Sequence, residues 1–217
     1  MAFSRDGKTV YVGTGYRGGV VYRVDVQQNK SAQVFDERTS TLAASRAPEI
    51  HDLAVSPNGK VLAVGVFRGI VLIDLKTNKE LRILPEDESV AFRRCCFSPD
   101  GRLVASVSSG ITLWDAGTGK SLKRLARTWE RGAARSIQFS PDGEHFVAGI
   151  DGGEALSSQV AIWKTDEVKP ATVLDTRAPS LKDVEFTPDG KQLAACHASG
   201  VKLWNFRSAA EKPGRIE

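Results

Sequence analysis

The segment Ile137–Glu144 has the sequence IQFSPDGE, and close versions of it occur at four other places in the chain. These are AFSRDGK (Ala2–Lys8), LAVSPNGK (Leu53–Lys60), CCFSPDGR (Cys95–Arg102) and VEFTPDGK (Val184–Lys191). In the commonest version an apolar stretch enters a Ser-Pro-Asp-Gly turn, where proline presets φ, aspartate bonds the local backbone and glycine allows positive φ. The turn glycines follow one another after 52, 42, 42 and 47 residues, which predicts a repeat architecture.

A second signal follows each turn at a regular place. It is a short apolar segment whose central column is Val24, Ile73, Trp114, Trp163 and Trp204. A strand of small residues, such as Leu103–Val107, lies between the two signals, and a further short strand, such as Leu81–Leu84 or Leu122–Leu125, follows them. Four short strands per unit without helical periodicity predict an all-β repeat fold.

The FSPDG turns, together with the Leu-Trp-Asp end at Leu113–Asp115, resemble the repeats of the WD-repeat β-propeller family over about residues 1–206. The resemblance implies that each unit forms one four-stranded blade and that the blades surround a central channel. We therefore predict a β-propeller of WD-repeat type with five blade units and a polar tail. The units are expected at about 1–45, 46–88, 89–130, 131–177 and 178–206, and the tail at 207–217.

The repeats depart from the family pattern in their polar residues. The Trp-Asp pair is complete only at Trp114, because Trp163 and Trp204 are followed by lysine and asparagine. The Gly-His pair that precedes the first strand in the family is missing from every repeat. The family's buried Asp-His-Ser-Trp network is therefore incomplete, and we expect the blades to be held mainly by apolar packing.

The number of repeats is also unusual. Rings of this family most often have seven blades, which at about 42 residues each would need about 290 residues. The first unit begins inside a strand, and the segment after Trp204 offers no convincing fourth strand. We predict an incomplete or open ring with truncated first and last blades, completed by self-association or by missing blades of a longer protein. A closed five-blade ring is the alternative.

Composition limits the class of protein. The chain has 217 residues, 41% of them hydrophobic and 26% charged, with a net charge of +4. These values are typical of a soluble globular protein, with no apolar stretch that would predict a membrane span or a secretion signal. Basic and acidic residues are interspersed, which makes nucleic acid an unlikely partner. The cysteines Cys95, Cys96 and Cys196 suit neither a disulfide framework nor a metal site, so we expect a reducing, cytoplasmic location.

Three glycine-rich segments look like ligand-binding motifs. Gly117–Ser121 (GTGKS) lacks the first glycine of a phosphate-binding loop and aligns with hairpin turns of other units. Gly13–Gly18 (GTGYRG) precedes a strand rather than the helix that dinucleotide binding needs. Asp151–Glu154 (DGGE) is interpreted as a solvated insertion, with a partner-contacting loop as the alternative. We expect no cofactor and no metal.

One column of basic residues is the candidate partner-binding site. It lies two positions before the strand-one apolar residue and consists of His51, Arg93, Arg135 and Lys182, which we call the basic column. The resemblance places it near the rim that the family uses for partners, where such groups would attract carboxylates or phosphates. The column can also be a coincidence in a basic chain, or its long side chains can cover core residues. Trp129, in the charged segment 127–131, is a further candidate contact.

The resemblance and the lack of a catalytic constellation predict a non-enzymatic protein-interaction scaffold whose partner is a protein or peptide, with an acidic partner as one option. The first alternative is a fragment of an enzyme, because Tyr11–Val26 also resembles the repeat of surface-layer and lactonase-type propellers. The second is a purely structural segment of a larger multidomain protein. Turnover of a lactone, compared with capture of a defined partner, distinguishes the enzyme from the scaffold.

Overall fold

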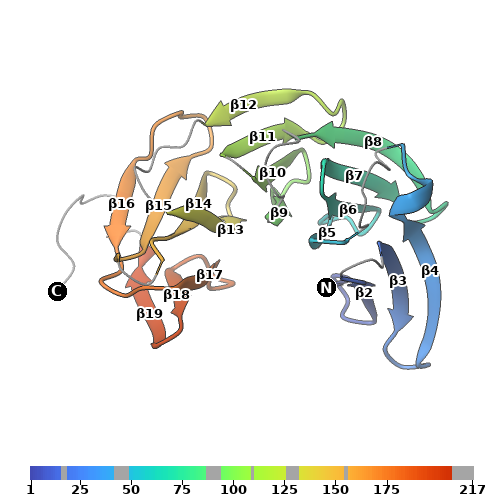
Figure 1. Cartoon of the computed structure of the whole chain (residues 1–217), viewed down its shortest axis with the longest axis horizontal. Coiled ribbons are helices and arrows are strands. Elements are labelled where there is room, and N and C mark those ends of the chain that lie inside the picture. Colours follow the sequence, from blue (N-terminus) through green and yellow to red (C-terminus); the bar gives the residue numbers. More distant parts are fainter. Residues whose placement is uncertain are drawn as a thin grey trace. The chain divides into compact units, whose positions relative to one another are not determined.

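A computed structural model describes residues 1–15, 19–41, 49–86, 94–108, 110–125, 132–153 and 156–206. The described chain is built of five antiparallel sheets, and in each sheet consecutive strands are hydrogen-bonded neighbours (Figure 1). The all-β propeller-type fold predicted from the repeats is thereby confirmed. None of the helices in the described ranges is long and apolar enough to cross a membrane.

The strands follow the chain in order. The first sheet contains β1 (Ala2–Phe3), β2 (Thr9–Gly13), β3 (Val20–Asp25) and β4 (Lys30–Asp36). The second contains β5 (Asp52–Val55), β6 (Val61–Val66), β7 (Gly69–Asp74) and β8 (Lys79–Pro85). The third contains β9 (Arg94–Phe97), β10 (Leu103–Val107), β11 (Ile111–Asp115) and β12 (Ser121–Leu125). The fourth contains β13 (Ala133–Phe139), β14 (His145–Asp151), β15 (Gln159–Lys164) and β16 (Thr172–Asp175).

The fifth sheet has three strands within the described residues, β17 (Leu181–Phe186), β18 (Gln192–His197) and β19 (Gly200–Asn205). The predicted tail at 207–217 lies outside the described ranges. At the other end of the chain, β1 is only two residues long. The open ring, its closed alternative and the boundaries of the five units stay predictions.

The Ser-Pro-Asp-Gly segments form the tight turns expected of them. In the third sheet the Ser98 hydroxyl donates to Asp100 Oδ1 at 2.6 Å, and the Gly101 N–H donates to the Ser98 carbonyl at 2.8 Å. Gly101 has a φ of 72°, which a side chain would strain. The turn glycines of the other four sheets share this positive φ: Gly7, Gly59, Gly143 and Gly190.

The strand registers explain the aromatic and aliphatic column. Its residues pair across the middle of each sheet with an apolar residue three positions after the turn glycine, as in Phe146↔Trp163 and Leu193↔Trp204. The same register joins Leu62 to Ile73. Because side chains alternate between the two faces of a strand, this column defines one apolar face in every sheet.

The GTGKS segment is a hairpin turn between β11 and β12. The Thr118 N–H donates to Asp115 Oδ1 at 2.6 Å, and the Gly119 N–H donates to the Asp115 carbonyl at 2.8 Å. Gly119 has a φ of 76°, and the equivalent Asn29 and Asn78 also have positive φ. The turn interpretation is confirmed. The GTGYRG segment lies between β2 and β3, and its residues 16–18 are outside the described ranges.

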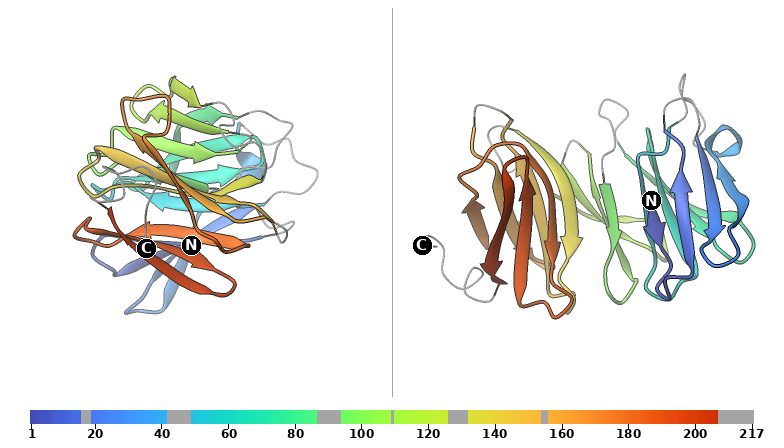
Figure 2. Two further views of the ribbon diagram at one scale, coloured as in Figure 1. Left: turned by 90° about the vertical axis from the view of Figure 1, so that its left-hand side faces the viewer. Right: turned by 90° about the horizontal axis from the view of Figure 1, so that it is seen from below.

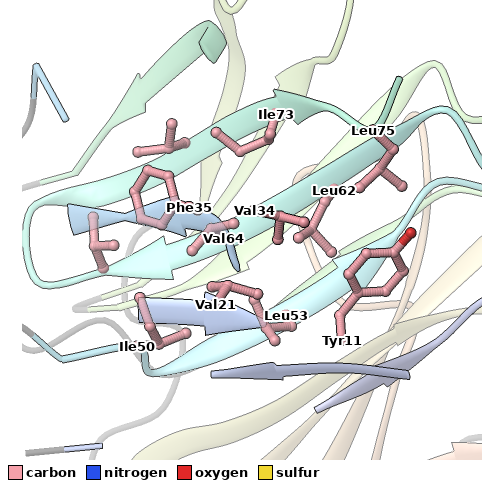
Figure 3. Close-up of a cluster of buried hydrophobic side chains, with 12 residues drawn as sticks. Tyr11, Val21, Val34, Phe35, Ile50, Leu53, Leu62, Val64, Ile73 and Leu75 are labelled. Carbon is pink, nitrogen blue, oxygen red and sulfur yellow. The ribbon is translucent and has the colours of Figure 1, made fainter. Parts of the chain in front are cut away.

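The chain divides into two compact units. Unit 1 comprises residues 1–109 and 113–122, and unit 2 comprises residues 110–112 and 123–217. In unit 1, the first and second sheets enclose a core that includes Tyr11, Val21, Leu62 and Ile73 (Figure 3). In unit 2, the fourth and fifth sheets lie side by side (Figure 2, right panel). Their shared core contains Val147, Ile162, Leu181 and Trp204.

Candidate partner-binding site

The structure describes three of the five predicted contact residues. His51 directly precedes β5, Arg135 lies in β13 and Lys182 lies in β17. Arg93 and Trp129 lie outside the described residues. Arg135 and Lys182 are exposed and belong to unit 2, whereas the half-buried His51 belongs to unit 1. The convergence of the basic column around one rim stays a prediction.

Arg135 and Lys182 occupy equivalent irregularities in their sheets. In β13 the pairing passes from Ala134↔Ile150 to Ser136↔Gly149, so that Arg135 is the extra residue. In β17 it passes from Leu181↔His197 to Asp183↔Cys196, so that Lys182 is the extra residue. A bulge of this kind bends the strand and re-aims the side chain that it carries. The fold therefore presents both cations from a defined backbone feature.

A buried carboxylate orients Arg135. The Arg135 Nε donates to Asp151 Oδ2 at 3.2 Å, and the Asp151 side chain is only 9% exposed. The interpretation of residues 151–154 as a solvated insertion is wrong for Asp151, which ends β14 and is buried. The contact offsets part of the arginine charge and restrains its side chain, whose exposed fraction of 44% keeps it accessible to a partner.

A second ion pair lies beside His51 in unit 1. Arg94 Nη1 is 3.6 Å from Asp52 Oδ1, and the Cys95 N–H donates to Asp52 Oδ2 at 2.9 Å. Burial raises the pKa of Asp52, against the lowering effect of the Cys95 N–H and Arg94. In the sequence, the only sign of this pair is that an acid directly follows His51 and a base directly follows Arg93.

His51 contributes less positive charge than its place in the basic column implies. Burial lowers the pKa of its imidazole from the usual 6.5, and the negative charge of Glu49 opposes this shift only in part. A histidine with a pKa below 6.5 is mostly neutral at pH 7. The cationic character of the described basic column therefore rests on Arg135 and Lys182.

A column of buried polar residues that is not apparent from the repeats follows the outer strands. Each member donates its backbone N–H to the carbonyl of the residue that directly precedes the third strand, as Glu86 does to the Arg68 carbonyl at 2.9 Å. Two further residues do the same: Glu37 to Gly19, and Thr176 to Ser158. All three side chains are buried. No common residue type marks the column, which is why alignment of the repeats did not reveal it.

Glu86 organises a buried network in unit 1. The hydroxyls of Ser106 and Ser108 donate to its two carboxylate oxygens, the second at 2.9 Å. Trp114 Nε1 donates to the Ser106 hydroxyl at 2.9 Å. In this sheet a glutamate thus completes a buried polar network beside the apolar core that was expected. In the fourth sheet Trp163 Nε1 is buried without a hydrogen-bond partner among the described residues, and Ala148 occupies the place of Ser106.

One group of side chains has the composition of a metal site. Ligand atoms of Asp142, Glu144 and His145 lie within 4.8 Å of one another. Asp142 Oδ1 already accepts from the Ser140 hydroxyl and, at 3.0 Å, from the Glu144 N–H. The same contacts form in the other Ser-x-Asp-Gly turns, so the aspartate has a structural role here.

Comparison with known proteins identifies the repeat. Residues 78–115 match the family model described as WD domain, G-beta repeat. The chain is similar to the transcriptional corepressor LEUNIG_HOMOLOG of Arabidopsis thaliana, with 24% identity over 81% of this chain and 22% of that protein. It is also similar to telomerase protein component 1 of Mus musculus, with 25% identity over 84% of this chain and 8% of that protein. WD repeat-containing protein 18 of Danio rerio is 31% identical over 52% of this chain and 28% of its own length.

Two solved structures share the fold. The hydrazine synthase of Kuenenia stuttgartiensis superposes with a TM-score of 0.76 at 22% identity, covering 90% of this chain and 54% of that chain. The β-propeller domain of Cps50 (Swd1) from Myceliophteria thermophila gives a TM-score of 0.76 at 16% identity, covering 97% and 66%. At these identities the likeness concerns the fold alone.

The chain spans less than a quarter of the length of the corepressor and less than a tenth of the telomerase component. The relatives support a protein-interaction scaffold in general and do not favour the lactonase alternative. Five repeated antiparallel sheets, the repeat-model match over residues 78–115 and the WD-repeat relatives together support one assignment, a β-propeller of WD-repeat type.

Proposed function

We propose that this chain is a non-enzymatic scaffold that binds a protein or peptide partner, and that the basic column selects acidic segments of that partner. The observation that carries the proposal is the pair of equivalent bulges that present Arg135 and Lys182. A rigid sheet that holds exposed cations at defined places favours an anionic ligand and restricts its register.

The restrained guanidinium of Arg135 supports this function. Its Nε contact with Asp151 holds the side chain at the edge of the fourth sheet, so less side-chain entropy is lost when a partner carboxylate binds. The mixed charges of the chain favour a protein partner over nucleic acid in this proposal, because nucleic-acid binding needs a concentrated basic surface. A cytoplasmic location belongs to the same proposal and is tested by imaging the tagged protein.

The experiment measures binding of a fluorescent oligo-glutamate peptide to the chain and to the double variant Arg135→Glu, Lys182→Glu. We expect the variant to bind at least roughly tenfold more weakly, which corresponds to about 1.4 kcal/mol. The binding of the unmodified chain should also weaken with added salt, because exposed charges are screened.

The matched control is Lys169→Glu, which reverses an exposed lysine in the loop between β15 and β16, at the opposite end of the fourth sheet. It should leave binding unchanged. Equal affinity of the double variant and the original chain would refute the role of the basic column. Preferential binding of a duplex oligonucleotide over the peptide would refute the acidic-protein partner.

A further inference from the structure

Neighbouring sheets pack through the same residue columns wherever a unit contains two of them. In unit 1, Tyr11 and Val21 of the first sheet pack against Leu62, Val64 and Ile73 of the second (Figure 3). The opposite face of the second sheet, with Ala63 and Leu72, packs against the third sheet. In unit 2, the fourth sheet packs against the fifth in the same way. Each sheet thus has two faces of defined composition. The leading face is turned toward the preceding sheet in the chain, and the trailing face is turned toward the following sheet.

The trailing face of the fifth sheet is exposed. Ala194 pairs with Leu203, and Cys196 pairs with Val201; in the second sheet the equivalent pairs are Ala63↔Leu72 and Gly65↔Ile70. Leu72 and Ile70 are at most 1% exposed, because the third sheet covers this face, whereas Leu203 is 59% exposed and Val201 is 62% exposed. We call the surface formed by Glu185, Ala194, Cys196, Val201 and Leu203 the trailing face.

This face also carries a polar group that suits a neighbouring strand. Between the fourth and fifth sheets, Gln138 Oε1 accepts the Phe186 N–H at 2.5 Å. The exposed Glu185 stands at the place of Gln138, five residues before the turn glycine. Glu185 thus offers acceptor oxygens at the place from which Gln138 accepts an N–H of the first strand of the next sheet.

The thiol of Cys196 stands where adjoining sheets approach closely. The equivalent residues of the first and fourth sheets are Gly13 and Gly149, and a Cβ at either would overlap Ile50 or Leu181 of the following sheet. The Cys196 side chain is exposed and forms no disulfide bond. A bulky group attached to this sulfur would lie where another sheet would pack against the trailing face. The reactivity of the thiol therefore reports whether such a sheet covers this face.

The leading face of the first sheet exposes the complementary columns. Phe3 is the apolar residue of the turn motif and is 58% exposed, whereas its equivalents Phe139 and Phe186 are 5% and 8% exposed. Val12 pairs with Tyr22 on the same face, and both are exposed, whereas the equivalent Val64 and Val71 are completely buried. This surface, formed by Phe3, Val10, Val12, Tyr22 and Val24, is the leading face.

We propose that the trailing face of one copy binds the leading face of a second copy, so that the chain associates head to tail. The first sheet of a second copy is the occupant because it offers the residue columns that cover this face between the sheets within a unit. The Phe3 N–H of the second copy then takes the place of the Phe186 N–H and donates to Glu185. A contact between two different faces can be repeated in a ring or a filament.

The first experiment measures the mass of the full chain in solution by light scattering over a range of concentrations. We expect concentration-dependent association that either Leu203→Glu or Phe3→Glu abolishes, because each change removes one of the two faces. When the two variants are mixed, each supplies the face that the other lacks, and they should form one-to-one dimers and nothing larger. Leu122→Glu, at a leucine of similar exposure outside both faces, should associate like the original chain.

The second experiment uses the thiol. In a Cys96→Ser background Cys196 is the accessible cysteine, since Cys95 is buried. We expect its reaction with fluorescein maleimide to slow at least roughly fivefold as the chain associates, and the labelled chain to lose association while keeping its circular dichroism spectrum.

Three results would overturn the proposal. The first is a chain that is monomeric at every concentration with a freely reacting thiol. The second is a monomer whose thiol is protected, which would assign the trailing face to the chain's own first sheet. The third is failure of the two folded variants to pair with each other. Peptide binding by Arg135 and Lys182 uses a different surface and stays measurable in the Leu203→Glu variant, so the two proposals fail separately.

Discussion

At the scale of single residues, buried carboxyl groups after the outer strands are the least expected feature. Glu37 is almost fully buried, and its carboxylate accepts the Glu49 N–H at 2.7 Å. Burial raises the pKa of Glu37 above 4.5, because one hydrogen bond compensates only in part for the lost hydration of the charge. Glu37 thus ties the loop after β4 to the entry of β5 at an electrostatic cost.

The pKa of Glu37 predicts a pH-dependent stability. The folded state holds this proton more tightly than the unfolded state, so the free energy of unfolding falls as pH rises from 4.5 through the folded pKa. Glu37→Gln does not titrate, and we expect the difference in Tm between the variant and the original chain to shift in favour of the variant as pH rises from 4 to 7. Thermal unfolding at several pH values measures this. Exposed Glu144→Gln is the control, and a difference that is constant with pH would contradict the prediction.

At the scale of elements, a polar network joins the outer strand of the second sheet to the third sheet. Glu86 directly follows β8, while Ser106 and Trp114 lie in β10 and β11. The positions of Ser106 and Trp114 in the repeat indicate the hydrogen bond between these two residues. Their acceptor cannot be predicted from the repeats, because the family's histidine is replaced by a glutamate 20 residues before Ser106.

Removal of the Glu86 carboxylate should destabilise this region. Glu86→Ala leaves the hydroxyls of Ser106 and Ser108 without the acceptor they use, and a buried unsatisfied donor costs about 1 to 3 kcal/mol. We expect the denaturant midpoint to fall accordingly, and Trp114 fluorescence to report the same transition. Ser108→Ala removes one donor rather than the acceptor and should cost less. Equal stability of Glu86→Ala and the original chain would exclude a stabilising network.

At the scale of the whole molecule, each unit depends on close approach between sheets. Gly149 lies in β14, and a Cβ there would overlap Leu181 of β17 and the Ser136 hydroxyl. Leu181 is itself buried in the core shared by the fourth and fifth sheets. The glycine is therefore required by packing between sheets rather than by its own backbone conformation.

A double-mutant cycle tests this packing. Gly149→Ala should lower the free energy of unfolding by about 1 to 3 kcal/mol, the usual cost of overpacking a core. Combined with Leu181→Ala, which opens space at the same point, it should cost less than the sum of the two single changes. Gly15→Ala, where a Cβ would meet nothing, is the neutral control. Additive costs in urea denaturation would show that the two residues do not share a contact.

The amino-acid sequence alone determined the turns, the strand order and the apolar columns, because these depend on neighbouring residues: proline, aspartate and glycine make the turn, and alternation makes the sheet face. Only the tertiary structure decided which polar groups meet. Asp52 reaches the Cys95 N–H across 43 residues, and Arg135 meets Asp151 across 16. Such contacts depend on how strands and sheets are brought together, and no local pattern encodes a partner that arrives from a different strand.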